Sequence, residues 1–481
     1  MTSNRFSARS AACAAALLLG ACTVSPPASR VSAPLAEAWY APLPHAGSLN
    51  DLRDWWARLD DPALLVLIDA AEQASASVAA AASRIAQARV TEVTAGAALG
   101  PSVDSSVAAQ RGNATFGIPL NTTLRAGLQA SWEVDMFGRN QLALTAARER
   151  SAGARSLWHD ARVSVAAEVA TQLLSRRTCL RRLALAEDDQ RSRAETARLT
   201  AINVRAGFAP GSAEQRSQAS VADGQAGVLQ LRTQCELPVK ALVALTALPE
   251  PAVRTELARS REWPRAPLTP IPAVPAQLLS QRPDVFNAER ELAAAAADVG
   301  NAQAQRLPRL SLTGSVGRAR FSAGGQTVML DTWSLGPFTL SLPLVDGGRL
   351  KVNIEAAQAA YDEAVAQYRG KVLNAVREVE EALLNLDSAA GRAEATRLSA
   401  SRQASAFEAE QRRYQSGLAS LLELEDSRRA LLQARQSMIE REQEQAGQWI
   451  ALYRALGGGF TPEPAAPTAS ISNPSIATRK P

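Results

Sequence analysis

The chain has 481 residues and a formal charge of +5, and 46% of its residues are hydrophobic although only 5% are aromatic. A chain rich in alanine and poor in aromatic residues is typical of long, closely packed helices rather than of several globular domains. Two histidines, and four cysteines without a CxxC spacing, argue against a histidine-rich metal site and a zinc ribbon. The absence of a compact lysine and arginine block disfavours binding to nucleic acid.

The N-terminus has the pattern of a signal peptide. Residues 1–21 combine two arginines with an apolar run from Ala11 to Leu19 that is too short to span a bilayer. The small residues Gly20 and Ala21 before Cys22 resemble the lipobox of bacterial lipoproteins. We therefore expect residues 22–48 to be a segment anchored by covalent lipid on Cys22. An ordinary signal peptide that ends near a cysteine is the alternative.

An internal repeat with an offset near 210 residues organises the chain. The sequence motif from Trp132 to Arg139 in the first half corresponds to the motif from Leu342 to Arg349 in the second. Gly207 and Gly417 each lie 68 residues beyond the arginine that ends these motifs, a coincidence that would be rare by chance. The chain is therefore expected to contain two copies of one structural unit.

The repeats define the expected domain organisation. Repeat 1 covers residues 49–248 and repeat 2 covers residues 283–460, and each begins with a helix. Residues 249–282 are rich in proline, which predicts an extended connector. The tail at 461–481 is rich in proline, serine, threonine and alanine, which predicts disorder.

Alternating apolar and polar residues predict one strand pair in each repeat. The pattern is unbroken in residues 124–134 and clear in residues 338–344, and it is weaker in their two partner segments. The expected strands are 102–111 and 124–134 in a pair at about 101–134, and 309–318 and 338–344 in a pair at about 308–344.

These strands have a length of about ten residues, which can cross a bilayer in a tilted barrel. No segment after the signal peptide offers 18 consecutive apolar residues, so we expect no transmembrane helix and only a closed β-barrel as a membrane span. Because four strands cannot close a barrel, the chain must oligomerise. A dimer with eight strands and a trimer with 12 both remain open at this point.

Long helices are expected in most of the remaining sequence. An apolar seam in residues 361–386 recurs about every 3.6 residues, which marks a packed helix face. The proline-free stretch from Arg349 to Gly417 spans roughly 100 Å at 1.5 Å per residue. The expected helical hairpins are residues 139–247, turning at Gly207, and residues 349–456, turning at Gly417.

Two cysteines are placed symmetrically about the first turn. Cys179 lies 28 residues before Gly207 and Cys235 lies 28 residues after it, so an antiparallel helix pair brings them to the same height. In an oxidising periplasm they should form a disulfide that stabilises the fold by about 4 kcal/mol. Two reduced, buried cysteines that face apart are the alternative.

Together these features resemble the TolC-type outer-membrane factor family, in the lipoprotein branch of the NodT type that serves resistance-nodulation-division (RND) efflux pumps. Small departures are Val345, where the family usually has phenylalanine, and Ala247, where a glycine usually ends the first hairpin. The sequence motifs on which the resemblance rests extend from about residue 50 to 460. They are Trp55-Trp56, Asp61 to Leu64, Ser83 to Arg89, Trp132 to Gly138, Gln281 to Val285, Ala288-Glu289, Pro308 to Leu312, Pro343 to Arg349 and Leu452 to Gly457.

The resemblance implies a mostly α-helical homotrimer that combines a 12-stranded outer-membrane β-barrel with a 12-helix periplasmic tunnel. It implies a passive duct in a tripartite efflux system, with a periplasmic adaptor protein, an inner-membrane RND pump and outer-membrane lipid as partners. No cofactor is expected apart from the lipid on Cys22. Residues before Pro62, those at 249–282 and those after Leu456 would form an equatorial collar.

The resemblance also implies site residues near the second turn. Rings of side chains close the periplasmic end in this family, and counting from Gly417 places them at Leu422, Asp426 and Arg429. Their spacing of i, i+4 and i+7 puts all three on one helix face. Three Leu422 side chains would form an apolar constriction, and three Asp426 carboxylates would form a ring that favours cations. Repeat 1 has Ser212, Arg216 and Ala219 at the equivalent positions.

The two turns are in this family the surfaces that meet the adaptor. The residues concerned are Gly207 and Phe208 in repeat 1 and Gly417 and Leu418 in repeat 2. The left-handed conformation that glycine tolerates would by itself explain a glycine at each turn. Docking of the adaptor is the sharper expectation.

Other classes of function are less well supported by the sequence. A type I secretion duct shares the fold, but the lipobox argues against it. A periplasmic structural coiled-coil lipoprotein would not need four strands or a repeat with a fixed offset. No GxSxG, P-loop, GxGxxG or HExxH motif points to an enzyme. Glu168 and Glu378 occupy equivalent helix positions, which suggests packing or lumen lining rather than catalysis.

Overall fold

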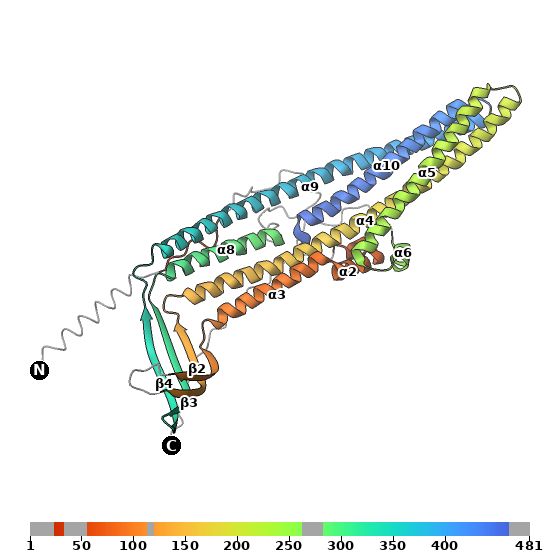
Figure 1. The fold of residues 1–481 in the computed structure, drawn as a ribbon. Coiled ribbons are helices and arrows are strands. Elements are labelled where there is room, and N and C mark those ends of the chain that lie inside the picture. Colours follow the sequence, from red (N-terminus) through yellow and green to blue (C-terminus); the bar gives the residue numbers. More distant parts are fainter. Residues whose placement is uncertain (1–23, 33–54, 113–119, 262–281, 461–481) are drawn as a thin grey trace, which may run out of the picture.

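The computed structural model describes residues 24–32, 55–112, 120–261 and 282–460. The molecule is elongated, with a sheet at one end and two long helical hairpins that extend to the other end (Figure 1). The predicted signal peptide, Cys22 and the tail at 461–481 lie outside the described residues.

The two repeats have the same order of elements. Each runs from a helix of 22 residues through two antiparallel strands to a helix of 67 residues and a shorter returning helix. Repeat 1 consists of α3 (Ala76–Ala97), β1 (Ser102–Gly112), β2 (Asn121–Val134), α4 (Arg139–Arg205) and α5 (Gly211–Thr246). Repeat 2 consists of α8 (Pro283–Ala304), β3 (Arg309–Ala323), β4 (Gln326–Ser341), α9 (Arg349–Gln415) and α10 (Leu421–Ala455).

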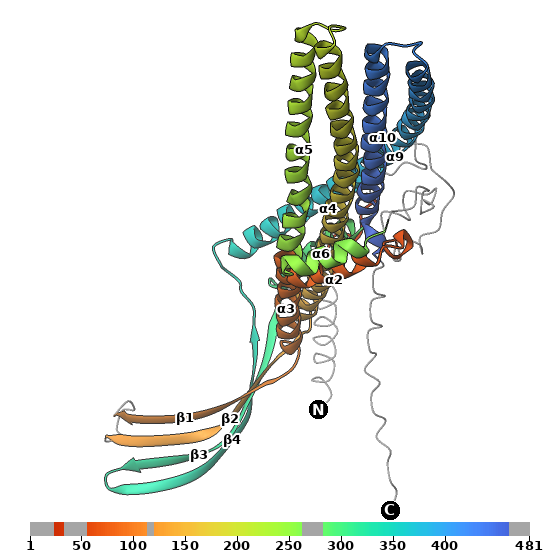
Figure 2. The same cartoon turned by 90° about the vertical axis from the view of Figure 1, so that its right-hand side faces the viewer.

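Short elements lie about halfway along the molecule (Figures 1 and 2). They are η2 (Ala57–Leu59), α2 (Pro62–Ala74), α6 (Glu250–Arg259) and η3 (Gly457–Gly459). The presence of α6 corrects the expectation that 249–282 is wholly extended. Pro249 and Pro251 lie at its N-terminus, where a proline costs no helical hydrogen bond, so they start this helix rather than prevent it.

The four strands form one antiparallel sheet in the order β1-β2-β3-β4, so β1 and β4 are its edges. The pairing register places alternate residues on opposite faces of the sheet. We call one face the apolar face; its members include Val103, Val107, Leu124, Leu128, Trp132, Leu310, Leu312, Val316, Trp333, Leu335, Phe338 and Leu340. The opposite, polar face includes Ser102, Asp104, Ser106, Thr123, Arg125, Gln129, Ser131, Ser311, Thr313, Ser315, Thr332, Ser334 and Thr339.

The strands are longer than the sequence pattern predicts. β2, β3 and β4 contain 14, 15 and 16 residues rather than about ten. β4 also begins at Gln326, well before the predicted residue 338, and it ends at Ser341 rather than at residue 344. Ser341 pairs with Arg309, the first residue of β3, so the residues after Ser341 have no partner in that strand.

A pair of glycines permits a close approach of β2 and β3. Gly127 and Gly317 are direct partners on the polar face. A Cβ atom added to either would lie 2.7 or 2.6 Å from a backbone carbonyl oxygen of the other strand. Only glycine fits such contacts, and the sheet curves strongly along its length (Figure 2).

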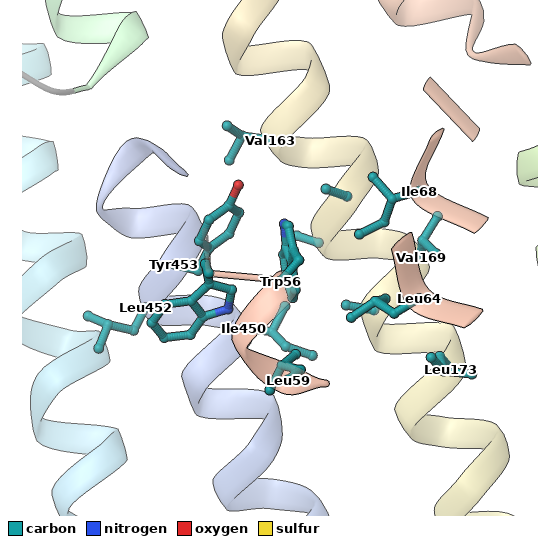
Figure 3. Packing of buried hydrophobic residues seen from close by; sticks show 14 of the residues in the cluster. Trp56, Leu59, Leu64, Ile68, Val163, Val169, Leu173, Ile450, Leu452 and Tyr453 are labelled. Atoms are coloured by element: carbon teal, nitrogen blue, oxygen red, sulfur yellow. The ribbon is translucent and has the colours of Figure 1, made fainter. Parts of the chain in front are cut away.

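The largest core cluster of the described residues lies at the level of α2 and α6 (Figure 1), and Figure 3 shows how its side chains pack. The Trp56 and Tyr453 rings pack at 4.6 Å between centroids, and Trp55 is almost fully buried beside them. Burial raises the pKa of Tyr453 to about 12. Because this cluster joins α2, α4, α9 and α10, it fixes the two repeats against each other.

Asp61 ties three segments together beneath this cluster. Its side chain is buried and accepts hydrogen bonds from the Arg177 guanidinium of α4 at 2.8 Å and the Ser260 hydroxyl at 3.0 Å. It also accepts from the backbone N–H of Ala63, which caps α2. The Asp61-Pro62 motif therefore has a structural role: it connects the start of α2 to α4 and to the residue after α6.

Ala247 carries a backbone strain where the first hairpin ends. It has φ +52° and ψ +13°, the left-handed conformation that glycine adopts without steric cost. Relief of about 1–2 kcal/mol of strain exceeds the added chain entropy of glycine, about 0.4–1 kcal/mol. We predict that Ala247→Gly raises the free energy of unfolding by roughly 0.5–1 kcal/mol in denaturant titrations.

Ala206→Gly is the matched control for this prediction. Ala206 also ends a helix but has φ −80°, so glycine relieves no strain there and should lower stability slightly. Equal effects of the two substitutions would contradict the assignment of strain to Ala247.

Candidate functional site

The two hairpin turns have the same construction. Two residues after the end of each of α4 and α9 lies a glycine with positive φ, +79° at Gly207 and +70° at Gly417. The backbone N–H of Phe208 donates to the carbonyl of Asn203 at 2.8 Å, and the corresponding bond of Leu418 also measures 2.8 Å. These closures leave the Phe208 side chain 86% and the Leu418 side chain 71% exposed at the ends of the molecule. Each tip thus presents one large apolar side chain to solvent.

The second turn carries a side-chain cap that the first lacks. The Ser420 hydroxyl accepts from the backbone N–H of Glu423, and the Glu423 carboxylate accepts from the backbone N–H of Ser420. The latter bond lowers the pKa of Glu423. No side-chain cap hydrogen bond begins α5 in repeat 1.

The expected gate residues lie together near the start of α10. Leu422 is 67% exposed, and the Asp426 and Arg429 side chains are also largely solvent-accessible. The Arg429 guanidinium donates to the Asp426 carboxylate within the same chain. One face of α10 therefore carries an apolar residue and an ion pair that point away from the core of their own chain.

The adjacent position, Arg428, belongs to a buried network that sequence reasoning missed. Its guanidinium donates to the Asp189 carboxylate of α4 at 2.9 Å and also pairs with Glu425. The Thr196 hydroxyl of α4 donates to Glu425 at 2.6 Å. The arginine is only 8% exposed, so these contacts join the two hairpins of one chain close to their tips.

The network continues from α4 to the returning helix of its own hairpin. Asp189 also accepts from the Arg193 guanidinium at 2.7 Å, and Arg193 donates to the Ser220 hydroxyl of α5 at 2.6 Å. Charged residues at i, i+3 and i+4 spacing are usual on exposed helix faces, so their pattern alone gives no sign of burial. The contact of α10 with α4 is the information that the sequence lacks.

A disulfide connects α4 and α5 farther from the tips. Cys179 and Cys235 are bonded, with 5.3 Å between their Cα atoms. Arg176 of α4 also donates to the Cys235 carbonyl at 3.0 Å. The two helices of the first hairpin are thus held in one register by covalent and polar contacts.

A cavity of about 640 Å³ lies between the two repeats, where α10 ends and α8 begins. Glu168 of α4 and Glu378 of α9, the pair at equivalent repeat positions, both line it. Five carboxylates line this cavity, those of Asp160, Glu168, Asp284, Glu378 and Glu381. The guanidinium groups of Arg282 and Arg454 line it as well.

Arg282 organises one wall of this cavity. It is nearly buried and makes two hydrogen bonds to Asp284, at 3.0 and 2.9 Å. It also pairs with Glu378 of α9 at 2.8 Å and donates to the carbonyl of Ala455, the last residue of α10, at 2.9 Å. The Arg282-Pro283-Asp284 motif therefore connects the start of α8 to both helices of the second hairpin.

The two aspartates of the cavity have opposite pKa shifts. Burial, together with the charge of Asp284, raises the pKa of Asp160. Burial would also raise the pKa of Asp284, but the hydrogen bonds and charge of Arg282 outweigh it and lower that pKa.

Neither a metal site nor a membrane-spanning helix is found in the described part of the chain. No group of three or more histidine, cysteine, aspartate or glutamate side chains is placed to hold a metal ion there. No single described helix has the length and hydropathy of a membrane span; α2 and α3, bent by 53°, satisfy the criterion only as a pair.

Comparison with known proteins identifies the family. The sequence model described as "Outer membrane efflux protein" matches residues 67–248 and 274–458, which is most of the chain. The chain belongs to the outer membrane efflux protein family. Family members are channels of efflux systems rather than enzymes, and they act at the outer membrane.

Individual relatives span nearly the whole chain. Outer membrane protein OprJ of Pseudomonas aeruginosa is 30% identical over 457 residues, covering 92% of this chain and 94% of its own. Nodulation protein T of Rhizobium leguminosarum bv. viciae is 27% identical and covers 95% of both chains. The solved structure of the outer-membrane channel OprN has a TM-score of 0.79 at 27% identity, covering 90% of this chain and 99% of its own.

The cavity of this efflux family member supports a prediction about pH. A carboxyl with a raised pKa destabilises the folded state when ionised, and this penalty disappears at pH values below both its folded and its unfolded pKa. We predict that Asp160→Asn raises the thermal unfolding temperature at pH 7 and that the gain shrinks as the pH falls to 4 and below.

Asp284→Asn is the matched contrast. A carboxyl with a lowered pKa stabilises the fold above its unfolded pKa, and this contribution is lost as the pH falls through the folded pKa. The substitution should therefore lower the unfolding temperature at pH 7, with a smaller effect in acid. Shifts of the same sign for both variants at pH 7 would contradict the two assignments.

Proposed function

We propose that the chain is the outer-membrane component of a tripartite efflux system, and that three copies form a passive duct for small molecules. The observation that carries this proposal is the sheet. Its two faces differ in polarity, its two edges pair with no other strand among the described residues, and helices of 67 residues extend from it. Unpaired strand edges cannot lie in lipid, so copies of the sheet must close on one another. With three copies, four strands each give a barrel of 12.

The proposed arrangement places the polar face inside the barrel and the apolar face against lipid. Gly127 and Gly317, whose missing Cβ atoms allow close backbone approach on the polar face, support curvature toward that side. The four hairpin helices of each chain, α4, α5, α9 and α10, would supply a 12-helix tunnel in the trimer. The exposed polar side chains of the strands would then line a water-filled lumen.

The segment that follows Cys22 supports a lipid anchor close to the junction of α8 and β3. The backbone N–H of Ser25 donates to the Gln303 side chain at 3.1 Å, near the point where α8 leads into β3. Farther along, the Tyr361 hydroxyl donates to the Ala28 carbonyl at 2.8 Å. Three residues span at most about 11 Å, so an acylated Cys22 would reach the membrane surface beside the sheet.

The tip of the second hairpin is proposed to close the duct. Leu422, Asp426 and Arg429 face away from their own chain, as side chains that line a shared aperture must. Three Leu422 residues would narrow the pore, and three Asp426 carboxylates would favour cations there. Repeat 1 offers no equivalent carboxylate, so three carboxylates rather than six would form the ring.

We predict that the double substitution Asp426→Ala/Arg429→Ala increases single-channel conductance several-fold when the full-length protein is inserted in planar bilayers. The reason is that truncation to alanine removes three carboxylates and three guanidinium groups from the proposed aperture, which widens it and changes its charge. Glu195→Ala/Arg198→Ala, an exposed i,i+3 pair of similar accessibility on α4, is the matched control and should leave conductance unchanged. Wild-type conductance in the double variant would refute the gate assignment, and absence of any channel in the wild type would refute the duct.

The hairpin tips are proposed to dock on a periplasmic adaptor protein that is served by an inner-membrane RND pump. Phe208 and Leu418 are the most exposed large apolar side chains at the two tips, and they make no contribution to the core clusters. Gly207 and Gly417 set the turns that present them.

We predict that Phe208→Asp/Leu418→Asp abolishes drug export in cells while bilayer conductance stays normal, because only docking requires these side chains. Ser416→Asp adds a charge to the same tip without removing an apolar group and should retain most export. Export that survives the double substitution would argue against docking through these residues.

A further inference from the structure

The charged residues of the apolar face are confined to one end of the sheet. Within the described strands, this face carries four charged side chains, and all lie in the three rows farthest from the helices. The three rows are Arg111-Thr122-Ser322-Thr327, Ala109-Leu124-Arg320-Met329 and Val107-Ala126-Arg318-Asp331. We call them the distal rows.

The remainder of the apolar face contains no charge in the described strands. The next rows toward the helices pair Leu128 with Val316 and Trp333, then Ala130 with Gly314 and Leu335, and then Trp132 with Leu312 and Phe338. A charged residue at the bilayer midplane destabilises a barrel, whereas one at the interface does not. The apolar rows therefore fit the hydrocarbon region, and the distal rows fit the headgroup region beyond it.

We propose that the distal rows bind the phosphate groups of lipids in the outer leaflet of the outer membrane. This inference rests on the proposed function, because it takes the strands to span the membrane with their helical end toward the periplasm. Its occupant is a membrane lipid with a phosphorylated headgroup, which the net charge of +2 on these rows, from three arginines and one aspartate, would attract.

The arginines have the geometry for this task. Neighbouring rows lie about 7 Å apart and neighbouring strands about 5 Å apart, so Arg318 and Arg320 on β3 can reach one headgroup. Arginine presents a planar fork of donors that matches phosphate in a bidentate manner, which lysine cannot do. Its apolar stem can also lie along the strand while the guanidinium reaches the interface.

Asp331 orients one of these groups without neutralising the patch. It accepts from Nε of Arg318 at 2.6 Å, and both side chains remain largely exposed, at 69% and 76%. The terminal nitrogens of Arg318 retain donors for a further anion. Among the residues that the structure describes, no carboxylate pairs with Arg111 or Arg320.

The opposite face provides a matched control. At the same height, the polar face carries a single arginine, Arg125, between Ala108 and Ala319. Removal of Arg125 lowers the charge of the sheet end by one unit but leaves the lipid-facing rows intact. A lipid that binds through these rows should therefore distinguish the two faces.

The test uses the purified full-length protein with a diphosphorylated disaccharide lipid and with the same lipid after phosphatase treatment. Native mass spectrometry should show about tenfold tighter binding of the phosphorylated form to the wild type. Arg111→Gln/Arg318→Gln/Arg320→Gln should abolish this preference, Arg125→Gln should retain it, and excess inorganic phosphate should not displace the lipid. The single variant Arg320→Gln, expected to lose part of the preference, serves if the triple variant fails to fold.

Three results would overturn the proposal: an unchanged preference in the triple and the single variant, an equal loss in Arg125→Gln, or full displacement by inorganic phosphate. Conductance of the same preparations in planar bilayers keeps this outcome separate from the proposed duct. A wild type that conducts without preferring the phosphorylated lipid refutes only the lipid site. A wild type that does not conduct refutes the duct.

Discussion

The rest of the structure depends on the hydrogen bonds that a four-stranded sheet leaves unmade. β1 and β4 expose rows of backbone N–H and C=O groups, and such groups cannot remain unpaired in hydrocarbon. In the proposed trimer, closure with further copies of the chain would remove both edges at once. The low aromatic content agrees with this proposal, because each chain would contribute a thin wall of strands and helices rather than a thick core. An aromatic cluster that includes Trp55, Trp56 and Tyr453 lies midway, where α2, α4, α9 and α10 meet.

The transition from sheet to helix is built in a similar way in the two repeats, although the aspartate lies four residues before Arg139 in repeat 1 and three residues before Arg349 in repeat 2. Asp135 accepts from the backbone N–H of Gln141, and Asp346 accepts from that of Leu350, both at 2.8 Å. The second contact lowers the pKa of Asp346. Gly138 and Gly348 precede the helices with φ +73° and +88°, a conformation that a side chain would strain. The aspartate caps the helix, and the glycine turns the chain from the strand into the hairpin.

Much of this architecture could be predicted because it is periodic. The hairpin helices, their glycine turns and the facing cysteines follow from spacing alone. The strand ends were harder, because Arg318, Arg320 and Asp331 interrupt the apolar alternation at the place where β3 and β4 extend beyond it. The helix α6 was not predicted because the prolines at its start were interpreted as a sign of extended chain. Arg428 could not be predicted, since charged i,i+3 pairs are the usual signature of a solvated face and only the packing of α10 on α4 buries this one.

The contrast between Arg428 and Arg429 bears on how a proposed aperture would be held shut. An exposed helical ion pair such as Asp426–Arg429 contributes only about 0.3–0.5 kcal/mol, too little to hold a constriction by itself. The buried contacts of Arg428 with Asp189 and Glu425 cannot be broken without leaving a charge in a poorly solvated place, which costs about 3–5 kcal/mol when a buried pair loses a partner. The tip of α10 is therefore held to α4 within each chain. Opening a shared aperture would then require the two hairpins of a chain to move together, or this network to rearrange, rather than the exposed pair alone to separate.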